Sequence, residues 1–116
     1  MDLEKLRIAD IDVEDGLHRF MSNEQMFVKY LKKFIDNDQY QALKMEIDRN
    51  PIDVKEAFER AHALKGICAN LSMAGILTVL NPMVESLRAG SVEGVKENMI
   101  KLSAQYDKVI TVLKQL

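Results

Sequence analysis

Hydrophobic positions recur at helical spacing along most of the chain. From Val95 onward they are separated by alternating steps of four and three residues, which keeps them on one face of a helix: Val95, Met99, Leu102, Tyr106, Val109, Leu113 and Leu116. Two further segments repeat this spacing, with Ala57, Ala61, Leu64, Cys68 and Leu71 in one and Met73, Leu77, Leu80, Val84 and Leu87 in the other. Shorter runs are marked by Phe27, Leu31 and Phe34, and by Tyr40, Leu43 and Ile47.

Helix-breaking and capping residues separate these runs, at Asn37-Asp38, Asn50-Pro51 and Ala89-Gly90-Ser91. Asp53, Ser72 and Ser91 are expected to cap the helices that follow them. Pro82 falls inside a helical run, and we expect a kink there because proline lacks a backbone donor.

Four substantial helices with short connections predict an all-α, antiparallel four-helix bundle. We expect the bundle to span residues 11–116, with a short extra helix near residues 13–21 closing one end. Residues 1–10 are expected to form an N-terminal extension. A chain of 116 residues has room for a single domain.

Composition and charge exclude several classes of partner. The 16 Lys and Arg residues against 18 Asp and Glu residues give a net charge of −2, so neither nucleic acid nor an anionic membrane is an expected partner. No apolar run approaches the roughly 18 residues that span a bilayer, and the charged N-terminus contains no apolar signal segment. Together with the single cysteine, this favours a cytoplasmic protein.

The chain offers little for metal or nucleotide chemistry. Two histidines and one cysteine are too few for a structural zinc site, and no glycine-rich phosphate loop is present. Cys68 and His62 lie on different helix faces, so they are not expected to form a nucleophilic pair. We expect no metal and no cofactor.

One helical segment carries the strongest candidate for chemistry. With Ala57, Ala61, Leu64, Cys68 and Leu71 buried, His62, Gly66 and Ala69 point away from the core, and Lys65 lies beside them. A glycine at an exposed helical position lowers stability by about 1 kcal/mol relative to alanine, so a partner's close approach would explain Gly66. A neutral imidazole is a competent nucleophile near pH 7, and the ammonium of Lys65 would offset the charge of a transferred phosphoryl group.

The other candidates have simpler interpretations. His18 is expected at the surface or in packing of the first helix, and Cys68 is expected to be a core thiol. The seven methionines are expected to fill gaps in the core. For Met21, Met26 and Phe27 the alternative is apolar contact to a partner near His62.

The sequence Ala61-His62-x-Leu64-Lys65-Gly66, with Asn70 beyond it, closely resembles the phosphorylation motif of histidine-containing phosphotransfer (HPt) domains. The likeness extends to 11–20, to Tyr30-Leu31-x-x-Phe34, and to Glu85, Arg88 and Gly90-Ser91. Shortly after the position of Asn70 the family usually has a glycine, where this chain has Ser72.

This resemblance implies that His62 accepts and donates a phosphoryl group, that Lys65 lies beside it, and that Gly66 and Ala69 admit a receiver domain. The implied partners are response-regulator receivers and the receiver of a hybrid sensor kinase. The family has no ATP site and its Mg²⁺ belongs to the receiver, so a phosphocarrier rather than an enzyme is implied.

Two other interpretations remain open from the residues alone. One is a helical adaptor that uses the face of Gly66 and Ala69 to bind a protein without phosphate chemistry. The other is an enzyme acting on a small molecule, for which the sequence shows no second titratable group within reach of His62.

Overall fold

The computed structural model describes residues 3–116, and within them the chain forms helices and no strand. The helices are α1 (Glu4–Ile8), α2 (Val13–Arg19), α3 (Glu24–Phe34), α4 (Gln39–Ile47), α5 (Val54–Asn70), α6 (Ala74–Arg88) and α7 (Val95–Leu113). The predicted all-helical class is therefore confirmed. The short helix expected near residues 13–21 is α2.

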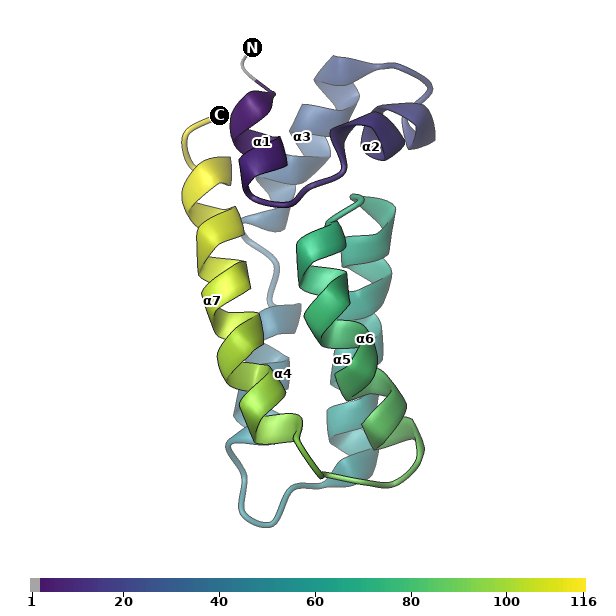
Figure 1. The fold of residues 1–116 in the computed structure, drawn as a ribbon, viewed down its shortest axis with the longest axis vertical. Coiled ribbons are helices and arrows are strands. Elements are labelled where there is room, and N and C mark those ends of the chain that lie inside the picture. The colour runs from purple at the N-terminus through teal and green to yellow at the C-terminus, as the bar shows by residue number, and fades with distance from the viewer. Residues whose placement is uncertain (1–2) are drawn as a thin grey trace.

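Helices α4 to α7 lie along the long axis of a molecule that measures 45 × 23 × 20 Å (Figure 1). Helix α5 packs against α4 and α6, and α7 packs against α6 and α4 (Figure 1). Helices α1, α2 and α3 gather at one end, where the chain also has both of its termini. This arrangement leaves one side of α5 exposed to solvent along much of its length.

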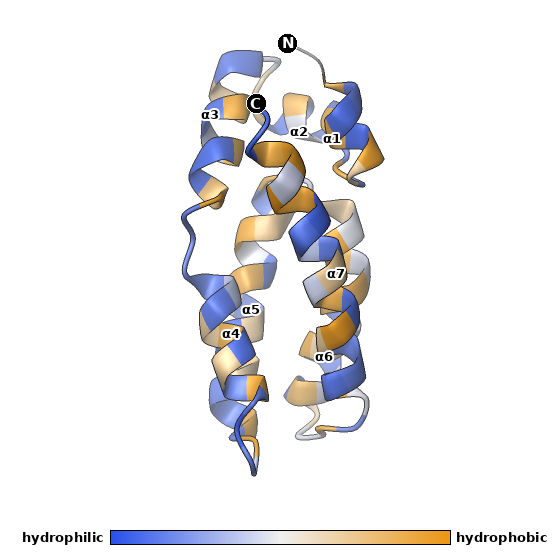
Figure 2. Cartoon of the chain, turned by 90° about the vertical axis from the view of Figure 1, so that its left-hand side faces the viewer, coloured by the Kyte–Doolittle hydropathy of each residue, from blue (hydrophilic) through white to orange (hydrophobic). Residues whose placement is uncertain are grey.

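The buried stripes predicted from spacing are nearly all in the core. All five predicted positions on α5 and its C-cap are buried, and Val95 to Leu113 on α7 are buried as well. Tyr40, Leu77 and Leu116 are exceptions because they are only partly buried. Ile76 and Met83 of α6 are fully buried without having been expected. Hydrophobic and hydrophilic positions alternate around each helix accordingly (Figure 2).

One of the three predicted helix caps is confirmed. The Asp53 carboxylate accepts a hydrogen bond from the backbone N–H of Glu56 and so begins α5. The predictions for Ser72 and Ser91 are wrong. The residues preceding α6 and α7 are Met73 and Gly94, neither of which caps through a side chain.

The two serines have other partners. The Ser91 hydroxyl accepts a hydrogen bond from Glu93 N within the loop, and Gly94, with a left-handed φ of 73°, is the N-cap of α7. The hydroxyl of Ser72 donates instead to Asp15 of α2, at 2.6 Å.

Helix α6 continues on both sides of Pro82, so the kink expected there does not interrupt the helix. The side chain of Pro82 is exposed, which keeps the proline ring on the outer face of α6.

Helix α1 was not expected from the sequence, and it packs against α7. Leu6 and Ala9 are fully buried. The Gln105 amide donates to the backbone oxygen of Ala9 at 3.0 Å, and Lys108 pairs with Asp10 at 3.1 Å. Residues 4–10 are therefore bound to the rest of the fold, and two short helices precede α3 instead of one.

None of the helices in residues 3–116 combines the length and the apolar character that crossing a membrane requires.

Candidate functional site

His62 lies near the middle of α5 with its imidazole exposed to solvent. Its neighbours on the inner face, Ala61 and Leu64, are fully buried and fix the rotation of the helix. Because these residues hold α5 against α4 and α6, the imidazole is presented outward on a rigid element. The predicted exposure of His62 is confirmed.

Gly66 lies one turn beyond His62 and faces open space. A Cβ built at Gly66 would meet no atom within 4 Å, apart from the backbone of its own helix and its chain neighbours. The contrast with Gly16 in α2 is informative, because a Cβ there would collide with the ring of Phe27. Packing within the described fold therefore explains Gly16 and leaves Gly66 unexplained, as the sequence suggested.

The two other predicted site residues border the same surface. Lys65 is half-buried, and within residues 3–116 it forms no ion pair, so its ammonium charge is not neutralised by a neighbour. Ala69 is half-buried as well and lines a small depression of about 120 Å³ together with Asp15 and Ser72. The structure thus brings His62, Lys65, Gly66 and Ala69 onto adjoining turns of one helix.

A further pair of residues lies beside His62. The ring of Phe58, one turn earlier on α5, lies 5.7 Å from the imidazole between centroids. The guanidinium of Arg88, at the end of α6, lies over the Phe58 ring at 5.1 Å and also pairs with Glu85 at 3.5 Å. Phe58 therefore contacts both the imidazole of His62 and the guanidinium of Arg88.

The contacts that Phe58 makes with His62 and with Arg88 were not expected from the sequence. The four-residue spacing of Phe58 and His62 could have signalled their contact. No local pattern predicts the approach of Arg88, because it depends on how α6 packs against α5.

Cys68 is buried, as predicted, and lies on a different face of α5 from the exposed histidine. Burial raises the pKa of its thiol to about 12, so almost no thiolate forms near neutral pH. This agrees with a core thiol and excludes a Cys68–His62 nucleophilic pair.

The remaining candidates divide between surface and core. His18 is exposed on α2. Met21 and Met26 are 90% and 44% exposed, whereas Phe27 is fully buried. The core prediction is therefore confirmed for Phe27 and wrong for both methionines, which lie at the tight turn before α3 and on the outer face of its first turn.

Asp15 links α2 to the end of α5. Its carboxylate accepts from Ser72 Oγ and from Arg19 Nε at 2.9 Å. The hydrogen bond from Ser72, followed by the bond from Arg19, lowers the pKa of Asp15 below its ordinary value.

The part of the chain that the structure describes contains no cluster of three or more His, Cys, Asp or Glu suited to a metal ion. A cavity of about 740 Å³ does open between α2, α3 and the end of α5. His62 is not among its lining residues, so the cavity brings no second titratable group to the imidazole.

Comparison of the chain with protein-family models, with curated proteins and with solved structures finds no match.

Proposed function

We propose that this protein carries a phosphoryl group on His62 and exchanges it with aspartates of receiver domains in a phosphorelay. The observation that carries the proposal is the exposed imidazole beside the open surface at Gly66. A receiver must bring its aspartyl phosphate within bonding distance of the imidazole, and only a side-chain-free stretch of helix admits such an approach. The resemblance of Ala61–Gly66 to the HPt motif supports the same function.

In the proposed reaction, an imidazole nitrogen of His62 attacks the phosphorus of the receiver's aspartyl phosphate. The N–P bond forms as the bond between phosphorus and the carboxylate oxygen breaks, and the electron pair returns to the carboxylate. Transfer in the opposite direction reverses these two bonds. The ammonium of Lys65 offsets the charge that arrives on the histidine, and the guanidinium of Arg88 adds a second cation nearby.

The proposal also includes a four-helix bundle, receiver-domain partners and a cytoplasmic location. Helices α4 to α7 would form the four-helix bundle that presents His62, with α1, α2 and α3 at one end. The partners would be a response-regulator receiver and the receiver of a hybrid sensor kinase, with Mg²⁺ bound to the receiver. As a carrier the protein would have no kinase activity of its own, and it would work in the cytoplasm.

The decisive experiment incubates the protein with a receiver that carries labelled phosphate on its aspartate. We expect label on this chain that is stable in base and labile in acid, the signature of phosphohistidine. His62→Gln should lose the label entirely. His18→Gln, which removes the other exposed histidine, should keep it.

Lys65 and Gly66 have separate tests in the same assay. Lys65→Ala should slow transfer about tenfold or more, whereas Lys101→Ala on the exposed face of α7 should not. Gly66→Gln should leave the helix at least as stable and yet block transfer, because its side chain occupies the open surface. Absence of label with several receivers would favour the adaptor interpretation instead.

A further inference from the structure

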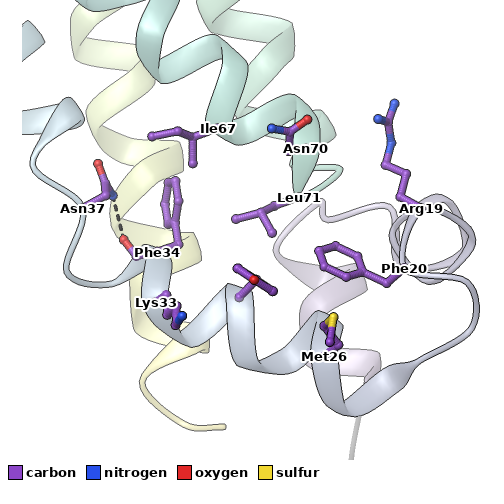
Figure 3. Close-up of a pocket in the computed structure, with 10 residues that line it drawn as sticks. Arg19, Phe20, Met26, Lys33, Phe34, Asn37, Ile67, Asn70 and Leu71 are labelled. Atoms are coloured by element: carbon purple, nitrogen blue, oxygen red, sulfur yellow. Dashed lines mark hydrogen bonds between the residues drawn. The ribbon is translucent and has the colours of Figure 1, made fainter.

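The cavity between α2, α3 and the C-terminal end of α5 has features that the proposed phosphoryl exchange does not use. Its volume of about 740 Å³ lies within the usual range for small-molecule sites. Ile67, Asn70 and Leu71 line it from the last turn and C-cap of α5, and Phe20 and Met26 line it from the opposite side (Figure 3).

The walls of this cavity are largely apolar and already ordered. The ring of Phe20 packs against those of Phe27 and Tyr30 at 5.5 and 5.6 Å between centroids. Phe34 is buried at the far end, and its ring contacts Tyr106 of α7 at 5.7 Å. These contacts fix the aromatic wall without a ligand, so a bound apolar group would meet a preformed surface.

Both charged residues that line the cavity are cationic, but only Lys33 has no carboxylate partner within the described residues. Arg19 and Lys33 line it, while none of the lining residues in the described part of the chain is acidic. Lys33 lies over the ring of Tyr30 at 5.0 Å, which holds its ammonium beside the aromatic wall. Arg19 uses Nε to bind Asp15, and its guanidinium extends away from the space between Phe20 and Leu71 (Figure 3).

Two side-chain amides line the cavity, Asn37 and Asn70, and only one of them is free to bind a ligand. Asn37 is fully engaged, because its amide nitrogen donates to Phe34 O and to the Tyr106 hydroxyl while its oxygen accepts from two backbone N–H groups. Asn70 is exposed, and within residues 3–116 its side-chain amide makes no hydrogen bond. Asn70 is therefore available to orient a polar group at the mouth of the cavity.

We propose that this cavity binds a small organic anion with an aromatic body, such as an aryl carboxylate. The ring would pack between Phe20 and Leu71, and the carboxylate would lie near the ammonium of Lys33. A purely apolar ligand would leave the ammonium of Lys33 without a counter-charge, and a cationic ligand would be repelled by it. This site is separate from His62, so the inference does not depend on the phosphocarrier function.

The test uses 2-naphthoate as the probe and 2-naphthalenemethanol as its neutral counterpart, with binding followed by amide chemical shifts in the full chain. We expect naphthoate to shift the amides of Ile67, Asn70 and Leu71 in a saturable way. The neutral alcohol should bind about threefold more weakly or worse, and added salt should weaken naphthoate binding.

A pair of matched lysine variants tests whether the ammonium of Lys33 binds the carboxylate. Lys33→Gln should weaken naphthoate binding about threefold or more, whereas Lys32→Gln, which removes the adjacent exposed lysine outside the cavity, should not. His62→Gln should bind naphthoate normally, which separates this site from phosphoryl exchange. Ile67→Glu places a carboxylate in the cavity and should abolish naphthoate binding.

The proposal is overturned if naphthoate leaves the cavity amides unshifted, or if the neutral alcohol binds as tightly as the anion. It is also overturned if a receiver domain shifts these amides while naphthoate does not, because the cavity would then serve as a protein contact only.

Discussion

Ser72 adopts a backbone conformation that residues other than glycine rarely take, at the turn between α5 and α6. Its φ is 55°, in the left-handed region, and its side chain is buried. The hydroxyl donates to Asp15 of α2, so the turn is tied to the helices at the end of the molecule. A single serine therefore combines backbone strain with a stabilising hydrogen bond.

Two substitutions separate the strain from the hydrogen bond. Ser72→Ala and Ser72→Gly both remove the hydroxyl, but only glycine accepts the left-handed φ without a steric penalty. We expect Ser72→Gly to be more stable than Ser72→Ala by about 1 kcal/mol, measured by urea unfolding. Equal stability of the two variants would show that the turn carries no strain at this position.

The same contact predicts a dependence on pH. The hydrogen bonds from Ser72 and Arg19 lower the pKa of Asp15 in the folded state, so the unfolded chain binds the proton first as pH falls. The stabilisation is therefore complete above the unfolded pKa, and it is lost as pH falls below about 4 and through the folded pKa.

The measurement is urea unfolding of the native chain and of Ser72→Gly between pH 7 and pH 3. The native chain should lose more of its free energy of unfolding than the variant over this range, because only it has the contact to lose. Identical pH profiles would contradict the role given to Ser72.

The sequence predicts the exposure, burial and capping role of a residue well where its neighbours lie on the same helix. The exposure of His62, the burial of Cys68 and the Asp53 cap all follow from spacing within or next to α5. The Ser72–Asp15 hydrogen bond joins residues 57 positions apart, and the position of Arg88 over Phe58 depends on interhelical packing. Such contacts are set by how helices pack, which a single sequence does not reveal.

Among the helices, α6 contains an internal proline that is expected to lower its stability. Pro82 lies inside it, where proline leaves the backbone oxygen of Thr78 without its helical donor and crowds it sterically. The proline side chain is exposed, so replacing it removes little packing.

We expect Pro82→Ala to raise the free energy of unfolding by about 1–3 kcal/mol, measured by urea unfolding. The control is Asn81→Ala at the neighbouring exposed position, which keeps its backbone donor and should change stability by less than about 1 kcal/mol. A destabilised Pro82→Ala would mean that α6 needs the proline to follow the surface of α5 and α7.

At the scale of elements, long periodic helices are the ones that spacing predicts. Helices α5, α6 and α7 have stripes long enough to define a face, and α2 was expected as a short helix. Helix α1 has only five residues, and Leu6 is its one buried side chain, so no period can be recognised. Helix α7 begins at Val95, where the hydrophobic spacing starts, but its N-cap is Gly94 and not the predicted Ser91.

For the whole molecule, the N-terminal segment contributes to the same core as the long helices. Leu6 is fully buried in the cluster that includes residues of α3, α5 and α7. Residues that the sequence placed in an extension thus add apolar burial, hydrogen bonds and an ion pair to the end of the fold.

Leu6→Ala is therefore expected to lower the free energy of unfolding by about 2–5 kcal/mol, the range for a leucine deleted from a packed core. Ile8→Ala provides the matched control, because Ile8 is 63% exposed and its loss should change stability by about 0.5 kcal/mol or less. Thermal or urea unfolding of both variants measures the difference, and equal effects would show that α1 is not part of the core.

The helical class of the whole chain follows from its periodicity, because no segment alternates as a strand would. A short helix near residues 13–21 was expected at one end, but its grouping there with α1 and α3 was not, since it depends on contacts such as Asp10 with Lys108 and Asp12 N with the Ser72 carbonyl. Distant pairs of this kind determine where short helices dock.

The buried thiol has a practical consequence for anyone attaching probes to this protein. Because burial raises the pKa of the Cys68 thiol, it stays protonated near neutral pH, and it is closed to reagents in the folded state. A new cysteine on the outer face of any helix would react with maleimide dyes or spin labels while the native one stays inert, so the wild-type background needs no mutation.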